Sequence, residues 1–141
     1  MFKFLPLLFI LISCADPNYV SGTKAIDGLS AECEMYFAED DVCLKTEWEQ
    51  RPTESEFGRM LLKFYHKDHP DTFISPTHTP FILLWMPSMG HGSSPVTMTF
   101  IEEGVYRASD IFFIMPGPWD IRYQLKSGND VVEEKIQQIT I

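Results

Sequence analysis

The sequence has few basic side chains. Its 141 residues include 11 Lys and Arg against 20 Asp and Glu, which gives a formal net charge of -9 at pH 7. Nucleic-acid binding requires cations clustered against the phosphates, so this shortage argues against a nucleic-acid partner. It also disfavours electrostatic docking on anionic lipid. The hydrophobic fraction of 45% excludes a disordered chain and is sufficient for one domain with a buried core.

Common catalytic motifs are missing as well. The sequence contains no GxSxG turn, no phosphate-binding glycine loop and no HExxH pair. Its adjacent acidic residues, Asp40 with Asp41 and Glu102 with Glu103, are better explained as charged turns than as acid–base pairs. We therefore expect no enzymatic activity.

Long apolar runs are absent after the N-terminus. Residues 4–12 are apolar throughout, but a helix that spans a bilayer needs about twenty such residues. A short run behind a single Lys is typical of a secretory signal. The run closes with Leu-Ile-Ser-Cys at 11–14, which resembles the lipobox of bacterial lipoproteins. The alternative is an ordinary signal peptide with a chance cysteine.

The lipobox resemblance implies a domain organisation and a location. It implies a signal peptide at 1–13, and a lipidated Cys14 with a flexible tether at 14–30, followed by a folded domain at 31–141. The resemblance also implies that the membrane is a partner, to which several acyl chains anchor the protein. Ala15 replaces the aspartate that retains some lipoproteins in the inner membrane. We therefore expect an extracytoplasmic, lipid-anchored protein, on the outer membrane facing the periplasm if the cell is Gram-negative.

Cysteine is scarce, with three residues in the chain. If Cys14 carries lipid, Cys33 and Cys43 are left as an even pair in an oxidising compartment. We expect them to form a disulfide worth roughly 2–3 kcal/mol. The alternative is a thiolate metal pair, but the spacing is wider than the CxxC of zinc or redox sites.

Alternation of apolar and polar side chains marks most of the remaining chain. A period of two indicates strands with one buried face, and continuous apolar runs indicate central strands. The pattern predicts an all-β fold, an immunoglobulin-like antiparallel β-sandwich of about seven or eight strands, with a small β-barrel as the alternative. The expected strands lie at 42–49, 59–65, 81–84, 96–101, 105–109, 111–114, 119–126 and 131–141.

One loop concentrates unusual chemistry. Met86, Met89 and His91 lie within six residues that also contain Pro87 and Gly90, and Gly92 follows directly, so a sharp turn is expected to bring the three side chains together. Thioether sulfur is soft and imidazole is intermediate, a donor set that suits copper, above all Cu(I). We expect the ring of the neighbouring Trp85 to lie against a bound cation. The alternatives are core packing for Met86 and simple solvent exposure for His91.

Other candidate ligands are weaker. Met115 occupies a second Pro/Gly-rich loop that would meet the first at one end of a sandwich, although core packing explains it better. Trp119 opens an alternating strand, which favours a core position. The spacing of His66 and His69 is compatible with metal binding, but these residues and His78 are more typical of exposed loops.

Three short motifs resemble the YtkA-like family of exported domains, which is related to the FixH-like proteins. Their order and spacing, over roughly 42–125, carry the resemblance. The motifs are Met86-Pro87-Ser88-Met89-Gly90-His91, Gly104-Val105-Tyr106 and Met115-Pro116-Gly117-Pro118-Trp119.

This resemblance implies an immunoglobulin-like domain outside the cytoplasm with a link to copper handling or oxidase assembly. It therefore implies a metal-efflux or oxidase-assembly protein as partner. The sequence departs from the family in its N-terminal extension with Cys33 and Cys43. Our hypothesis is a lipid-anchored domain that holds or hands over Cu(I). The rival hypothesis is a metal-free interaction module of the cell envelope.

Overall fold

The computed structural model describes residues 21–22 and 33–141. The predicted signal peptide, Cys14 and most of the predicted tether lie outside these residues. The described part of the chain is all β, and within it no helix is long and apolar enough to cross a membrane.

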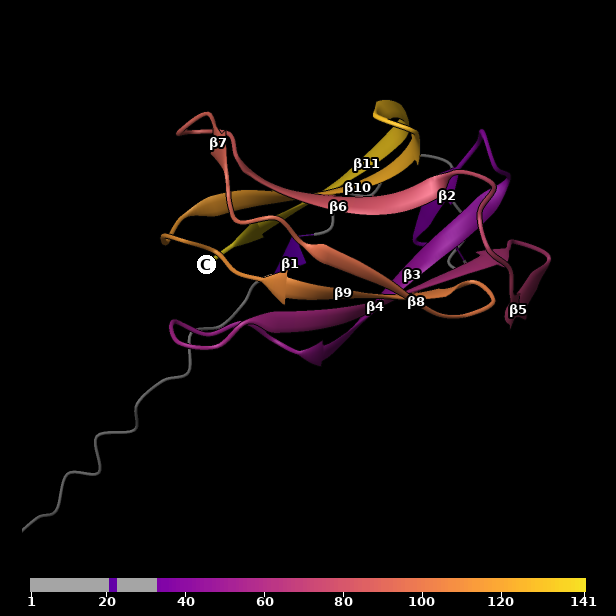
Figure 1. Cartoon of the computed structure of the whole chain (residues 1–141), viewed down its shortest axis with the longest axis horizontal. Helices are drawn as coiled ribbons and strands as arrows, with labels where there is room; N and C mark the ends of the chain where they lie inside the picture. Colours follow the sequence, from indigo (N-terminus) through magenta and orange to yellow (C-terminus); the bar gives the residue numbers. More distant parts are fainter. Residues whose placement is uncertain (1–20, 23–32) are drawn as a thin grey trace, which may run out of the picture.

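Two antiparallel sheets face each other (Figure 1). The first has the order β1 (Ser21–Gly22), β11 (Asp130–Thr140), β10 (Pro118–Ser127), β6 (Thr79–Met86) and β7 (His91–Gly92). The second has the order β2 (Met35–Phe37), β3 (Val42–Gln50), β4 (Gly58–His66), β9 (Val105–Ile111) and β8 (Thr97–Glu102), with β5 (His69–Phe73) beside β4.

The strand order confirms the predicted immunoglobulin-like sandwich. The run β3-β4-β9-β8 corresponds to strands A-B-E-D of an immunoglobulin domain, and β7-β6-β10-β11 corresponds to C′-C-F-G. In the described residues the two sheets stay separate and do not close into the small barrel that was the alternative.

Alternation along the strands builds the core between the sheets. On β10, Trp119, Ile121, Tyr123 and Leu125 are at most 1% exposed, and the intervening side chains, which are polar or charged, point to the opposite face of the sheet. Burial raises the pKa of the Tyr123 hydroxyl above its ordinary value. The group is therefore a neutral donor, and it bonds the Gln137 Oε1 at 2.8 Å.

Two expectations need correction or extension. The predicted strand at 111–114 is wrong, because β9 ends at Ile111 just after Asp110, whose φ of 61° turns the chain out of the extended conformation. Part of the apolar run is still explained by burial, since Ile111 and Phe113 are buried and Phe113 packs edge-on against Trp119 at 5.4 Å. Within the predicted tether, Ser21–Gly22 pairs with β11.

The predicted disulfide is confirmed. Cys33 and Cys43 are bonded, with Cα atoms 5.4 Å apart, and the bridge ties the segment before β2 to β3.

Nearby, His78 is half-buried, so its assignment to an exposed loop was wrong. Its backbone N–H donates to Asp40 at 2.9 Å, and its Nδ1 lies 2.5 Å from the same carboxylate.

The sandwich therefore has two different ends (Figure 1). The disulfide end comprises the Cys33–Cys43 bridge, the β2–β3 turn, the segment between β5 and β6, and the β8–β9 turn. The methionine end comprises the β6–β7 loop and the segment from β9 to β10. Strand β6 connects them, since it starts directly after His78 and finishes at Met86.

Candidate metal site

A tight hairpin turn sets the geometry of the Met/His loop. The Met86 carbonyl accepts hydrogen bonds from the backbone N–H groups of Met89 at 3.2 Å and Gly90 at 2.9 Å. Gly90 has a φ of 66°, a conformation that glycine adopts without strain. The turn returns the chain so that Met86 and His91 are directly paired across β6 and β7. Paired residues of antiparallel strands project to the same face, so these two predicted ligands share a face.

Met86 reaches into the methionine end rather than into solvent. It is 3% exposed and belongs to the main core. A Cβ added to Gly117 would lie 2.7 Å from the Met86 Cε, so the thioether lies against the backbone of the segment that contains Met115. Met115 is itself partly buried against the core. The structure thus brings the two predicted methionine-containing loops together.

His91 is half-buried beside Trp119. The two rings are edge to face, with centroids 6.3 Å apart. The His91 Nδ1 lies 3.1 Å from the Gly92 carbonyl oxygen, which can only accept a hydrogen bond, so the Nδ1 carries the proton in this contact. In the tautomer with its proton on Nδ1, the Nε2 carries the lone pair. A backbone carbonyl on the other nitrogen is the usual arrangement for a metal-binding histidine.

Trp119 contacts both the Met115 segment and His91. It is fully buried, and its Nε1 donates to the Met115 carbonyl at 3.0 Å. Its predicted core position is confirmed, yet its contact with His91 was not anticipated. The signal in the sequence was indirect: Trp119 closes the third motif of the family resemblance, and β10 must begin where β6 ends if the two strands pair antiparallel.

Two predicted site residues differ from Met86 and His91 in exposure or in the face they occupy. Met89 is at the tip of the turn and is 58% exposed. Trp85 precedes Met86 on β6 and so faces the opposite side of the sheet. There the Arg122 guanidinium lies over its ring at 5.5 Å. Trp85 therefore does not share a face with Met86 and His91, whereas Trp119 is in direct ring contact with His91.

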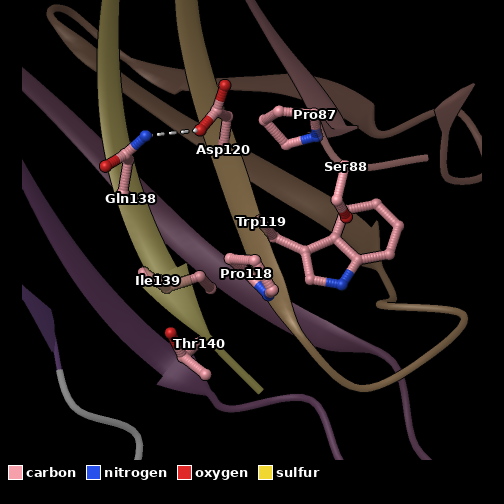
Figure 2. A pocket seen from close by; sticks show the side chains of 8 residues that line it. All are labelled: Pro87, Ser88, Pro118, Trp119, Asp120, Gln138, Ile139 and Thr140. Carbon is pink, nitrogen blue, oxygen red and sulfur yellow. Dashed lines mark hydrogen bonds between the residues drawn. The ribbon is translucent and has the colours of Figure 1, made fainter. Parts of the chain in front are cut away.

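A pocket of about 520 Å³ adjoins the site. Figure 2 shows it between the β6–β7 loop and the paired strands β10 and β11, with the Asp120 carboxylate accepting a hydrogen bond from Gln138 at 3.3 Å. Arg122 donates to the same carboxylate at 3.2 Å. The pocket is lined by Pro87, Ser88, Pro118, Trp119, Asp120, Gln138, Ile139 and Thr140.

The predicted ligands at this end carry sulfur and imidazole nitrogen. Among residues 21–22 and 33–141, no three or more His, Cys, Asp or Glu side chains gather so that they could hold a metal ion. Met86, His91, Met115 and Met89 instead offer three thioethers and one ring nitrogen. This set fits a soft monovalent ion such as Cu(I), and it does not fit ions that prefer oxygen ligands.

Comparison of the chain with family models, with curated proteins and with solved structures finds no match. The resemblance to the YtkA-like family therefore stays a prediction carried by the three motifs.

Proposed function

We propose that the protein is a lipid-anchored, extracytoplasmic domain that binds Cu(I) at the methionine end and hands it to a metal-efflux or oxidase-assembly partner. Met86 and His91 are the central ligands, with Met89 and Met115 completing the set. The pairing of Met86 with His91 on one face, next to Trp119, is the observation that carries the proposal.

Burial and exposure divide the roles within this ligand set. Met86 is already ordered by the core, which lowers the entropy cost of bringing a ligand to the ion. Met89 is exposed at the loop tip and is the natural first contact for incoming metal. The Trp119 ring, which contacts His91, supplies an electron-rich surface for the bound cation. An exposed soft ligand next to buried ones suits transfer between proteins.

Cu(I) titration of the full chain in detergent micelles, against a chromophoric competitor with ascorbate as reductant, tests this function. We expect one ion per chain. Met86→Leu and His91→Ala should each weaken Cu(I) binding by at least about tenfold. At metal sites, even the loss of a residue that only hydrogen-bonds to a ligand lowers the affinity about 10–100-fold, so the loss of a ligand should cost at least as much. Leu is close to Met in volume, so Met86→Leu should cost less than about 1.5 kcal/mol of stability. Met98→Leu is the matched control, because Met98 also packs against the core but lies on β8.

Tryptophan emission separates the two candidate rings. Cu(I) should quench the emission of the Trp85→Phe variant as in the original chain, and the quenching should be lost in Trp119→Phe. Absence of competition at any stoichiometry, or equal losses in the Met98 control, would refute copper binding.

The rival function is a metal-free interaction module. It is favoured by the packing of Met86 in the core and by the exposed apolar side chains Met89 and Ile114, which are 58% and 46% exposed at the same end. In that case metal does not bind with useful affinity, Met86→Leu acts only through stability or partner contact, and Met89→Ser weakens contact with an envelope protein. Crosslinking in intact cells from a photoreactive residue at position 89 tests it.

A further inference from the structure

Strand β8 has an edge that no strand covers in the described part of the chain. It is the last strand of its sheet and pairs with β9 on one side. Alternate backbone N–H and C=O groups of such a strand point away from the sheet and can pair with another chain. Edge strands are usually blunted by Lys, Pro or a bulge, but residues 97–101 contain no charge and no proline. The register shift comes only after Phe100, so residues 97–100 are regularly paired.

The core-facing side of β8 is incomplete. Met98 and Phe100 pair with Ala108 and Tyr106 and share their face. Ala108 is fully buried and Met98 packs against the core, yet Phe100 is 59% exposed. Its ring touches Tyr106 edge-on, with the ring centroids 5.6 Å apart. The opposite sheet thus leaves Phe100 uncovered, and one more strand beside β8 would cover it.

Charge at the two ends of β8 selects the partner. Glu102 and Glu103 follow the apolar stretch at one end. At the other end the Asp110 carboxylate accepts a hydrogen bond from the Thr97 hydroxyl at 2.6 Å. The cation on β9, Arg107, is already bound to Glu49 through two contacts at 2.7 and 2.8 Å. Both ends of the edge are therefore acidic.

This charge pattern disfavours a second copy of the chain. Antiparallel pairing of two β8 strands would place Glu102 of one copy beside Thr97 and Asp110 of the other. Like charges directly opposite each other destabilise strand pairing. A strand with cations at both ends would instead place opposite charges beside each other, which stabilises strand pairing.

We propose that β8 is a docking edge for an extended segment of a partner protein, apolar at its centre and flanked by Lys or Arg. The segment adds to the sheet as a further strand. Backbone hydrogen bonds supply affinity, while Phe100 and the acidic ends supply specificity. This inference is independent of copper binding, because β8 contributes no ligand to the methionine end.

Fluorescence anisotropy of a labelled peptide with the full chain in zwitterionic micelles tests the proposal. The probe has a Thr-Val-Thr-Phe centre with two Lys at each end. Two control peptides carry Glu flanks, or carry the Lys flanks around a centre with N-methylated amides that cannot pair. We expect the Lys-flanked probe to bind at least about tenfold tighter than either control, a difference of about 1.4 kcal/mol.

Variants of the full chain locate the binding. Phe100→Ser should weaken binding of the probe severalfold. Phe57→Ser should not, although Phe57 is 54% exposed and so matches it, because Phe57 lies between β3 and β4. Glu102→Lys, at an exposed position, should lower the preference for Lys flanks. Equal binding of the control peptides, equal effects of the two Phe variants, no binding, or a dimer in sedimentation that Phe100→Ser dissolves would each overturn the proposal.

Discussion

The two ends of the sandwich are held in different ways. At the disulfide end, the Cys33–Cys43 bridge is accompanied by the close contact between the His78 ring and the Asp40 carboxylate. The Glu133 carboxylate of β11 also accepts a hydrogen bond there, from the Glu39 backbone N–H at 3.0 Å. At the methionine end Trp119 joins the β9–β10 segment to His91, and the Asp120 carboxylate accepts hydrogen bonds from Arg122 and Gln138. The covalent link lies at one end, and the soft ligand atoms gather at the other.

This difference shows how a small domain can separate stability from binding. A ligand methionine must be free to change partners, so a rigid, charged frame around it would oppose metal exchange. The distant cross-links restrict the chain without touching the ligands, because β6 spans the distance between His78 and Met86. The predictions below alter the disulfide end and ask whether the methionine end responds.

The largest effect is expected from crowding the disulfide end. Gly104 has a φ of 69°, and a Cβ there would lie 2.4 Å from the Ile74 backbone nitrogen. Backbone atoms cannot move aside cheaply, so Gly104→Ala should lower the free energy of unfolding by more than about 3 kcal/mol. Urea unfolding followed by circular dichroism measures it.

Gly90 at the methionine end is the matched control. Its φ of 66° is nearly the same, but nothing lies within 4 Å of an added Cβ. Gly90→Ala should therefore cost only the intrinsic strain of a left-handed alanine, about 1 kcal/mol. Similar losses in the two variants would show that the ends do not differ in rigidity.

The disulfide comes next. Cys33 and Cys43 are ten positions apart, and closing a loop of this size stabilises a protein by about 2–3 kcal/mol. The double variant Cys33→Ala with Cys43→Ala should lose this amount in urea unfolding. Its Cu(I) affinity should stay within about twofold, because the bridge lies at the opposite end from Met86.

The single variant Cys33→Ala separates the bridge from side-chain packing. It should lose nearly as much stability as the double variant, because either change removes the disulfide. A fall in Cu(I) affinity in folded protein would contradict the separation of stability from binding.

The fold was largely predictable because its signals are local. Alternation on β3, β4 and β10 and the turns at Gly104 and Gly128 follow from neighbouring residues. The strand expected at 111–114 failed for a physical reason: apolar side chains are buried there by a bend as well as they would be by a strand. Phe113 packs against Trp119 from that bend.

The site was predictable only in part, since its contacts depend on strand register. The loop that carries Met86, Met89 and His91 is contiguous and was visible from composition. The contact of Met86 with Gly117 and that of His91 with Trp119 depend on how β6 pairs with β10. Alternation assigns faces to residues but does not assign partners to strands. The Asp40–His78 contact was missed for the same reason, because it joins residues 38 positions apart.

The smallest effect concerns acid stability at the disulfide end. Burial acts to raise the pKa of Glu133, but hydrogen bonds from the Glu39 and Ala38 backbone and from Lys135 outweigh it, so the pKa lies below its ordinary value of 4.5. A lowered folded-state pKa stabilises the protein above the unfolded pKa, and this contribution is lost as the pH falls through the folded pKa. Glu133→Gln should therefore cost about 1 kcal/mol at pH 7 and progressively less below about pH 4.5.

Thermal unfolding of Glu133→Gln and of the original chain between pH 7 and pH 3 measures the difference in their stability. Glu47→Gln is the control, because the Glu47 side chain is 63% exposed in its pair with Lys63 and should contribute less than about 0.5 kcal/mol at any pH. If the gap between Glu133→Gln and the original chain stays constant with pH, Glu133 acts by packing alone. The disulfide end would then owe its rigidity to the bridge and to Asp40 with His78, and it would be less electrostatic in character than its contacts indicate.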